Sequence, residues 1–385
     1  MEIMMKSLGE IITGNTPSKK NEEFWNSGDI YFVKPDIISD NGVNEIFESN
    51  EYISELARKK ARIVSKDSIF ITCIGSIGKI GIALEGEYAF NQQINAIVPN
   101  DKVVPKYLAY NLLYNKPRLV SIANAPVVPI INKSQFGDFT INIDLDKNKQ
   151  SEIVDVLDKL TYIIKQRTDE LSALDNLIKA RFVELFGDPR CNPYGFSKKQ
   201  LKDTCKVVTG NTPSRSVEKY YGDYIEWIKT DNIVSGLLNP TKASEKLSEE
   251  GMKVGRTVGK DSILMACIAG SVTSIGRVCV TDRTVAFNQQ INAVVPVNYN
   301  ILFLYVLLQL SKEYLVGEIN MALKGILSKA KLEEKEFIVP PMELQEQFAD
   351  FVKQVDKTKV ALQRSLEKVQ MLFDSLMQNF FDKHE

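Results

Sequence analysis

The chain repeats itself once, and this duplication restricts the possible folds more than any other feature. Residues 12–18 (ITGNTPS) reappear as 208–214 (VTGNTPS), and residues 89–96 (AFNQQINA) reappear letter for letter as 286–293. The two motifs recur in the same order at nearly the same distance, about half of the 385 residues. Long motifs that recur in this way indicate an internal duplication rather than chance similarity.

Two shorter matches lie between these motifs. The segment 28–36 resembles 222–231, and the segment 67–73 resembles 261–267, each pair ending on the same residue type. With only two copies, each far longer than a solenoid unit, the pattern favours two globular heads over a repeat array. The length of the chain also exceeds what one core usually supports.

Each copy mixes strand and helix signals. The TGNTP motif combines a proline with a glycine that we expect at positive φ, which is typical of a turn. Residues 68–74 and 262–268 are apolar runs of strand length, whereas the leucine-rich runs 107–113 and 302–310 favour short helices. The predicted class of each head is therefore α+β.

A long segment without glycine or proline follows each head, at 147–186 and 343–381. Apolar residues recur there at alternating spacings of three and four, the pattern of a coiled coil. The predicted seam consists of Leu157, Leu160, Ile164, Leu171, Leu174 and Ile178 in the first helix and Val355, Leu362, Leu366, Val369, Phe373 and Leu376 in the second. Long core helices of a bundle are the alternative interpretation.

The predicted organisation is a first head at 1–146, a spacer helix at 147–187, a second head at 188–342 and a second spacer helix at 343–385. Because each helix follows a compact domain, antiparallel packing of the two helices is the simplest closure. A helix of ~40 residues is ~60 Å long at 1.5 Å per residue. We therefore expect two α+β heads, related by a pseudo-two-fold repeat and separated by two long antiparallel coiled-coil helices. The seams also carry Phe351 and Phe381, which we expect to lie outside the two-helix interface and to contact a partner.

Composition excludes several classes of function. Five scattered cysteines with no Cys-x-x-Cys pair suit neither a zinc site nor a disulfide framework, so we expect reduced thiols and no metal. The one histidine, His384, stands next to the end, which argues against a histidine-based triad. No apolar run is long enough for a membrane span, so we expect no membrane contact and a cytoplasmic location. The net charge is only −1, so any binding to DNA would depend on local clusters of cations.

With duplicated heads and two spacer helices, the chain resembles the specificity subunits of type I restriction–modification systems. The resemblance rests on residues 8–18 (LGEIITGNTPS) and their copy, Asn91-Gln92 and Asn288-Gln289, residues 337–341 (FIVPP) and residues 185–189 (LFGDP). It covers essentially the whole chain. One departure occurs at residues 139–143 (FTINI), which lack the diproline of the second copy.

The resemblance implies that each head is a target-recognition domain for one half of a bipartite site in double-stranded DNA. It implies that the helices set the number of unread bases and dock two methyltransferase subunits, which carry S-adenosylmethionine and methylate adenine. A restriction subunit can join for ATP-dependent translocation and cleavage. The chain itself would then be a non-catalytic specificity subunit that needs no cofactor.

Candidate DNA contacts follow from the chemistry of phosphates, which bind lysine, arginine, hydroxyls and backbone N–H groups. The two TGNTPS turns run into cations, and Lys34 and Lys229 occupy matched positions, so a phosphate clamp is one interpretation. A buried turn beside solvated lysines is the other. The candidates from these segments are Asn15, Thr16, Ser18, Lys19, Lys20, Lys34, Asn211, Thr212, Ser214, Arg215, Lys219 and Lys229.

Two glycine-rich loops that end in a cation, 75–81 and 269–277, could bring backbone close to DNA or could simply be tight turns. Their candidates are Ser76 and Lys79 in the first copy and Ser271 and Arg277 in the second. The Asn-Gln-Gln triplets have the right chemistry for adenine. They are identical in both copies, however, so we favour a structural hydrogen-bonding role.

The residues that choose the DNA sequence should lie where the copies diverge, at 38–62 against 234–256 and at 75–87 against 270–283.

Two rival functions remain. A methyltransferase in the same chain lacks support, because no Gly-x-Gly occurs and Asn192-Pro-Tyr194 is only part of the catalytic loop of amino-methyltransferases. The phosphate-binding loop of ATPases is also absent from the sequence. A protein–protein scaffold with two heads on a helical rod is the second rival, and periodicity does not separate it from DNA reading.

Overall fold

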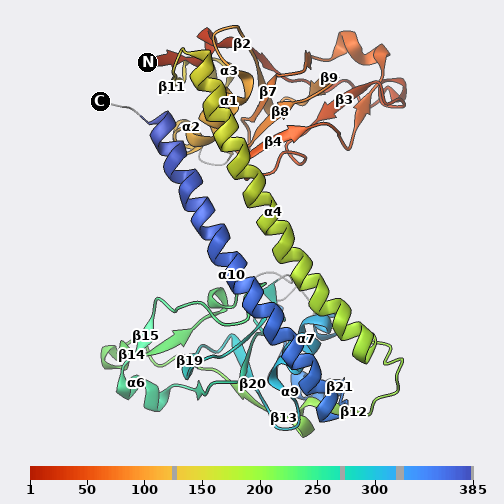
Figure 1. Cartoon of the computed structure of the whole chain (residues 1–385), viewed down its shortest axis with the longest axis vertical. Coiled ribbons are helices and arrows are strands. Elements are labelled where there is room, and N and C mark those ends of the chain that lie inside the picture. The colour runs from red at the N-terminus through yellow and green to blue at the C-terminus, as the bar shows by residue number, and fades with distance from the viewer. Residues whose placement is uncertain (124–127, 269–273, 318–324, 383–385) are drawn as a thin grey trace. The chain divides into compact units, whose positions relative to one another are not determined.

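The computed structural model describes residues 1–123, 128–268, 274–317 and 325–382. These residues form two compact units. Unit 1 comprises Met1–Arg167 and the segment that begins at Ser365, and unit 2 comprises Thr168–Arg364. Each unit therefore contains one head together with part of both long helices (Figure 1).

The head of unit 1 contains three sheets. A five-stranded sheet has the order β2-β10-β7-β8-β4, a four-stranded sheet has the order β5-β3-β9-β6, and β1 pairs with β11. The strands are β1 (Glu2–Met4), β2 (Gly9–Thr13), β3 (Ile30–Val33), β4 (Val43–Ile46), β5 (Tyr52–Ile53), β6 (Ile63–Ser65), β7 (Ile69–Thr72), β8 (Ile80–Ala83), β9 (Glu87–Phe90), β10 (Ile94–Pro99) and β11 (Thr140–Asn142). The short helices are α1 (Pro105–Tyr114), α2 (Lys116–Ile122) and α3 (Lys133–Asp138).

The head of unit 2 repeats this arrangement. Its sheets have the orders β13-β20-β17-β18 and β15-β14-β19-β16, and β12 pairs with β21. The strands are β12 (Lys198–Gln200), β13 (Cys205–Thr209), β14 (Tyr221–Ile228), β15 (Lys246–Leu247), β16 (Thr257–Val258), β17 (Ile263–Ala266), β18 (Val278–Val280), β19 (Val285–Phe287), β20 (Ile291–Pro296) and β21 (Glu336–Ile338). The helices are α5 (Leu201–Thr204), α6 (Glu249–Val254), α7 (Ile301–Leu310), α8 (Lys312–Val316) and α9 (Lys329–Glu334).

The apolar runs of the sequence occupy the centres of these heads. Strands β7 and β17 are buried at every position, which explains why their sequences are continuous apolar runs without alternation. The predicted short helices are confirmed as α1 and α7, which belong to the same apolar clusters as these strands. Strand β3 runs parallel to β9 and β14 runs parallel to β19, so the two heads share one topology. The predicted α+β duplication is confirmed.

The glycines of the TGNTPS motifs differ from the prediction. Neither Gly14 nor Gly210 has a positive φ. A Cβ on Gly14 would instead lie 2.2 Å from the carbonyl oxygen of Asn91, and one on Gly210 would lie 2.1 Å from that of Asn288. The glycine is required because another backbone segment passes directly against it, and not because of the turn conformation.

The two long helices are α4 (Lys147–Phe186) and α10 (Met342–Phe381), each an uninterrupted run of 40 residues. Within unit 1, Leu157 and Leu160 of α4 share an apolar cluster with Phe373 and Met377 of α10. Each predicted seam residue is buried or half-buried rather than exposed. Apolar burial of this kind stabilises the helices far more than helix propensity does.

The same two helices pack in unit 2. Phe182 and Phe186 of α4 contact Phe348 of α10, with ring centroids 5.5 and 5.6 Å apart. Further along, Lys359 of α10 pairs with Asp175 of α4 at 2.6 Å. The partner number falls from 359 to 348 as the number in α4 rises from 175 to 182, so the helices are antiparallel. Lys359, which interrupts the apolar seam in the sequence, is neutralised by a charge on the facing helix.

Both long helices begin in the same way although the first lacks the diproline. The side chain of Gln150 accepts a hydrogen bond from the backbone N–H of Val104 at 2.6 Å and donates to the carbonyl of Asp144. Gln345 accepts from the N–H of Asn300 at 3.0 Å and donates to the carbonyl of Pro340. A buried glutamine thus ties each helix to its own head, and the diproline is not needed for this anchor.

The expectation for Phe381 is wrong. Its side chain is 1% exposed, and its ring lies 5.2 Å from the ring of Tyr107 in α1, so it belongs to the core of unit 1. Phe351 is half-buried against the apolar cluster of unit 2, with the Arg181 guanidinium 6.0 Å from its ring. The seam pattern did not show these contacts because they come from the heads and from the opposite helix, far away in the sequence.

Candidate nucleic-acid interface

The two strongest sequence motifs contact each other in both heads. The hydroxyl of Thr16 donates a hydrogen bond to the side-chain oxygen of Gln92 at 2.9 Å, and Thr212 bonds Gln289 in the same way. One residue earlier, the side-chain amides of Asn15 and Asn211 donate to backbone carbonyls at 2.6 and 2.9 Å. The TGNTPS turn is therefore attached to the AFNQQINA segment, at the turn that joins β9 to β10 in unit 1 and β19 to β20 in unit 2.

The amides of the Asn-Gln-Gln triplets form hydrogen bonds within the head. Asn91 donates to the side-chain oxygen of Gln93 at 2.9 Å and accepts from its backbone N–H at 3.1 Å. Asn288 and Gln290 make the same pair of bonds, both at 3.1 Å. Both asparagines are buried. This geometry agrees with the structural role that the identity of the two octapeptides suggested.

A carboxylate bridges two of the predicted cations in each head. In unit 1, Glu51 accepts from Lys34 on one oxygen and from Lys19 on the other, the second at 3.0 Å. In unit 2, Glu245 accepts from Lys229 on one oxygen and from Arg215 on the other, the second at 2.6 Å. We call these two groups the bridged cation pairs. The sequence analysis proposed the four cations but missed both glutamates.

Aromatic rings lie under the more exposed cation of each bridged cation pair. The ammonium of Lys19 is 4.9 Å from the centre of the Trp25 ring. The guanidinium of Arg215 is 4.7 Å from the ring of Tyr221 and 5.3 Å from that of Trp227. Cations over aromatic faces are held by the ring quadrupole and keep one side open to solvent.

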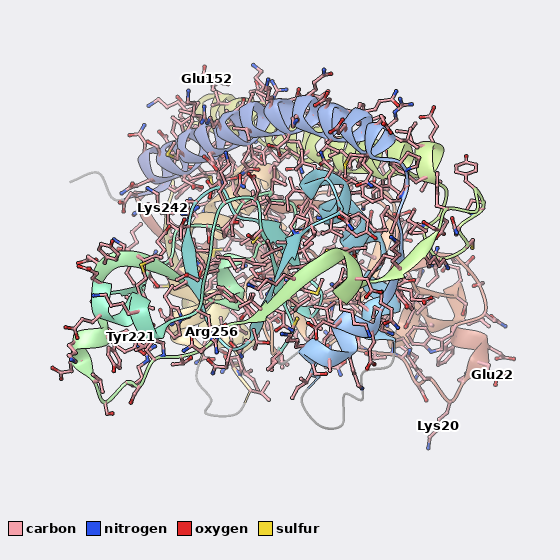
Figure 2. The ribbon with its side chains drawn as sticks, turned by 90° about the horizontal axis from the view of Figure 1, so that it is seen from below. Lys20, Glu22, Glu152, Tyr221, Lys242 and Arg256 are labelled. Carbon is pink, nitrogen blue, oxygen red and sulfur yellow. The ribbon has the colours of Figure 1, made fainter. Side chains whose placement is uncertain are left out.

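A cavity of about 540 Å³ adjoins the first bridged cation pair and is lined by residues that include Lys19, Trp25 and Glu51. Lys20, which follows Lys19 in the chain, projects away from the ribbon (Figure 2).

The electrostatics of both groups favour the charged forms. Burial alone would raise the pKa of Glu51, but the hydrogen bonds from Lys34 and Lys19 outweigh it and keep this pKa below its usual value. The hydrogen bond from Lys229, reinforced by Arg215, lowers the pKa of Glu245. The bond to Glu51 raises the pKa of Lys34. The carboxylate of each bridged cation pair is therefore held in its ionised form by the two basic side chains.

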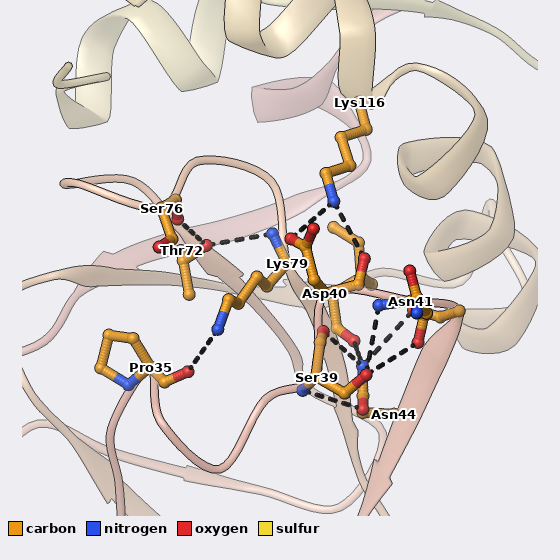
Figure 3. A network of polar contacts seen from close by, with 11 residues as sticks. Pro35, Ser39, Asp40, Asn41, Asn44, Thr72, Ser76, Lys79 and Lys116 are labelled. Atoms are coloured by element: carbon orange, nitrogen blue, oxygen red, sulfur yellow. Dashed lines mark hydrogen bonds and ion pairs between the residues drawn. The ribbon is translucent and has the colours of Figure 1, made fainter. Parts of the chain in front are cut away.

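The glycine-rich loop of unit 1 joins a second polar network (Figure 3). Lys79 donates to the carbonyl of Pro35 at 3.2 Å, and Lys116 at the start of α2 donates to the side chain and the carbonyl of Asp40, both at 2.9 Å. The hydrogen bond with Lys116 lowers the pKa of Asp40. The cation that ends this loop is thus bonded to the head, with an ion pair beside it.

The corresponding loop of unit 2 ends at Arg277, whose guanidinium donates to the carbonyl of Thr230 at 3.2 Å. Arg277 lines a cavity of about 310 Å³ together with Lys312 and Ser235. Burial and, after it, the charge of Arg277 lower the pKa of Lys312. The same cavity is also lined by the carboxylates of Asp175 and Asp356.

The remaining predicted contacts are distributed around these groups. Ser18 and Ser76 are exposed, Ser214 contacts the hydroxyl of Ser216 at 2.8 Å, and Lys219 pairs with Glu250 at 2.9 Å. Ser271 lies outside the described residues. In the described parts of the chain, no group of histidine, cysteine and acidic residues could hold a metal ion. None of the described helices is long and apolar enough to cross a membrane.

Comparison with known proteins places these heads in a class. Residues 1–173 and 193–370 match the type I restriction modification DNA specificity domain, so the chain carries this domain twice. The two matches cover most of the sequence. The chain belongs to the type I restriction–modification DNA specificity family.

Individual relatives agree with this membership. The specificity subunit of the type I restriction enzyme MjaIX from Methanocaldococcus jannaschii is 25% identical over 403 residues, covering 97% of this chain and 90% of that protein. The EcoR124I/EcoR124II specificity subunit from Escherichia coli is 29% identical over 182 residues, covering 44% of each. The crystal structure of an S subunit from M. genitalium has a TM-score of 0.62 at 15% identity, covering 100% of this chain and 96% of that one. A second structure, from work on the assembly of the type I restriction–modification system, has a TM-score of 0.53 at 14% identity, covering 99% and 97%.

Proposed function

We propose that this chain is the sequence-reading subunit of a type I restriction–modification complex, in which each head reads one half of a bipartite DNA site. The observation that carries the proposal is the presence of two complete DNA specificity domains in one chain, each attached to both long helices. One domain can read one short sequence, so a duplicated domain supports a site with two halves. Its place of action would be the cytoplasm, where the DNA of a prokaryotic cell lies.

In this proposal the long helices fix the number of unread bases between the half-sites. Two uninterrupted helices of 40 residues, packed antiparallel within each unit, support a rigid connection. The helices also dock two methyltransferase subunits, and a restriction subunit joins the complex where DNA is cleaved. Those subunits carry out catalysis, and this chain determines the DNA sequence at which they act. The exposed apolar residues Tyr162 and Leu177 on α4 and Met371 and Leu372 on α10 are available to such partners.

The proposed contacts with DNA are the bridged cation pairs, the TGNTPS hydroxyls and the cations that end the glycine-rich loops. Lysine and arginine would contact phosphates, which positions a head without specifying a sequence. Base choice would fall to the segments in which the heads differ, 38–62 and 75–87 in unit 1 and 234–256 and 270–283 in unit 2. Cations and hydroxyls at matched positions would hold the DNA, and residues that differ in kind between the heads would read it.

The test is a map of DNA methylation across the genome in cells that carry the chain with its methyltransferase partner and in cells that lack the chain. We expect a bipartite motif that disappears with the chain. Exchanging residues 1–146 for the corresponding head of a relative should change one half of the motif and leave the other half and the gap unchanged. If both halves changed together, the heads would not be independent readers and the proposal would be wrong.

A further inference from the structure

The glutamates of the bridged cation pairs occupy the same structural position in the two heads. Glu51 directly precedes β5, and its carbonyl accepts a hydrogen bond from the backbone N–H of Phe32 at 2.9 Å. Glu245 directly precedes β15, and its carbonyl accepts from the N–H of Trp227 at 3.1 Å. Both glutamates lie in segments where the two copies otherwise diverge, so an acid recurs where the surrounding sequence has changed.

The two oxygens of each glutamate also divide their contacts in the same way in both heads. One carboxylate oxygen takes the matched lysine that follows the parallel strand, and the other takes the cation that follows the TGNTPS turn. The second cation is a lysine in one head and an arginine in the other, so charge is kept although the side chain differs. An anion with two adjacent oxygens between two cations is also how a DNA phosphate is bound by a pair of basic residues.

DNA can reach both groups from solvent. The outer cations are largely exposed, at 61% for the side chain of Lys19 and 57% for that of Arg215, whereas the two glutamates are about one-third exposed. The rings of Trp25 and Tyr221 hold the outer cations in place from one side. The outer ion pairs, Lys19–Glu51 and Arg215–Glu245, involve an exposed cation and are therefore weak, so an incoming phosphate can replace the carboxylate there at little cost. The inner pairs with Lys34 and Lys229 are part-buried.

Resting on the proposed DNA-reading function, we propose that Glu51 and Glu245 stand in for a DNA phosphate in the free protein. Each carboxylate occupies the site of a backbone phosphodiester and is displaced when the head binds its target. The ligand of the site is therefore the phosphate backbone, and the glutamate competes with it for the two cations, which lowers affinity for DNA of the wrong sequence. A phosphate that merely replaces a carboxylate gains little binding energy, so only DNA that also satisfies the base contacts is held firmly.

This proposal differs measurably from a purely structural role. A carboxylate that stays in place and orients the two cations would be needed for DNA binding, and removing its charge would weaken the complex. A carboxylate that competes with phosphate restrains binding, and removing its charge would strengthen the complex. The dependence on salt also separates the two roles, because log K falls with log salt by about 0.9 for each phosphate neutralised.

The experiment uses the full chain and compares Glu51→Gln, Glu245→Gln and the double variant with the unaltered protein. Matched controls are Asp138→Asn in unit 1 and Glu333→Gln in unit 2, which remove the same charge from other ion pairs, those with Lys6 and Lys329. Fluorescence anisotropy measures the dissociation constant for a short duplex of random sequence over a series of salt concentrations. Thermal melting of each variant verifies folding, and Glu51→Asp, which keeps the charge, should behave like the unaltered protein.

For each glutamate we expect random duplex to bind roughly three- to tenfold more tightly, and the slope of log K against log salt to steepen by about 0.9. The double variant should show about twice the change in slope, and the controls should show little. Unchanged or weaker binding by the variants, with the unaltered chain still bound to the duplex, would overturn this inference and leave the proposed function intact. A chain that binds no duplex in any form, even with its methyltransferase partner, would overturn both.

Discussion

The two heads hold their bridged cation pairs in the same way, but they differ in the loop that follows the parallel strands β3 and β14. In unit 1, the segment between the buried Ile38 and the positive-φ Gly42 contains Asp40, which pairs with Lys116. In unit 2, the segment between the matched Ile233 and Gly236 contains only Val234 and Ser235. The acid that pairs with a lysine near the glycine-rich loop of unit 1 therefore has no counterpart within the matched segment of unit 2, residues 234–235.

This comparison distinguishes two kinds of residue. Groups that recur in both heads, such as Gly14 and Gly210 or the bridging glutamates, make the same backbone contacts and the same ion pairs in both copies. Groups that occur in one head alone, such as Asp40 and the extra strand β4, alter the charge and shape of the surface that DNA would meet. A duplicated protein can thus keep one scaffold while its two copies come to read different sequences.

The largest effect is expected where phenylalanines at the end of a long helix pack against a short helix of each head. In unit 1, Phe381 of α10 packs on α1, whereas in unit 2 Phe182 and Phe186 of α4 pack on Phe303 of α7. Phe381→Ala should destabilise the protein by about 3 to 5 kcal/mol, because it removes a buried ring and leaves a cavity. Chemical denaturation of the full chain measures this loss. Gln378→Ala, at an exposed position of the same helix, is the control. A variant with unchanged stability and weaker binding to a methyltransferase partner would instead make Phe381 a docking residue.

A second, somewhat smaller effect tests whether both heads require a glycine at the matched positions 14 and 210. Gly14→Ala and Gly210→Ala each place a methyl group within 2.2 Å of a backbone oxygen, so the contact between the two repeated motifs must open. We expect each to cost about 2 kcal/mol or more, since overpacking a tight site forces backbone shifts. Gly28→Ala and Gly259→Ala, where an added Cβ has no neighbour within 4 Å, should cost little. If one of the two motif variants were as stable as its control, the heads would not share this constraint.

Whether a feature could be predicted from the sequence depends on how far apart in the chain the residues that determine it lie. The duplication, the short helices α1 and α7 and the two long helices follow from local periodicity and from comparison of one copy with the other. The close approach behind Gly14, the partner of Phe381 and the bridging role of Glu51 depend on strands that are distant in the chain. A glutamate before a two-residue strand gives no periodic signal, so sequence analysis found the cations and missed the carboxylate between them.

The smallest effect concerns the charge difference between the two loops. Asp40→Asn should release Lys116 beside Lys79 and strengthen binding of random duplex by roughly two- to threefold, with a slope steeper by about 0.9, because one more cation becomes available to phosphate. Ser235→Asp places a carboxylate in the cavity lined by Arg277 and Lys312, and it should change both quantities by a similar amount in the opposite direction. Together the two substitutions exchange the loop charges of the heads.

The control for this exchange is Asp138→Asn, which removes one negative charge from the exposed pair with Lys6 elsewhere in unit 1. The same anisotropy titration over a series of salt concentrations measures all three variants. If Asp138→Asn shifted the affinity as much as Asp40→Asn, only net charge would matter and the contrast between the loops would have no bearing on DNA binding. A response confined to Asp40 and Ser235 would instead assign the difference between the heads to the surface that meets the DNA backbone. The head without an acid at the position of Asp40 would then hold nonspecific DNA more tightly than its sister head.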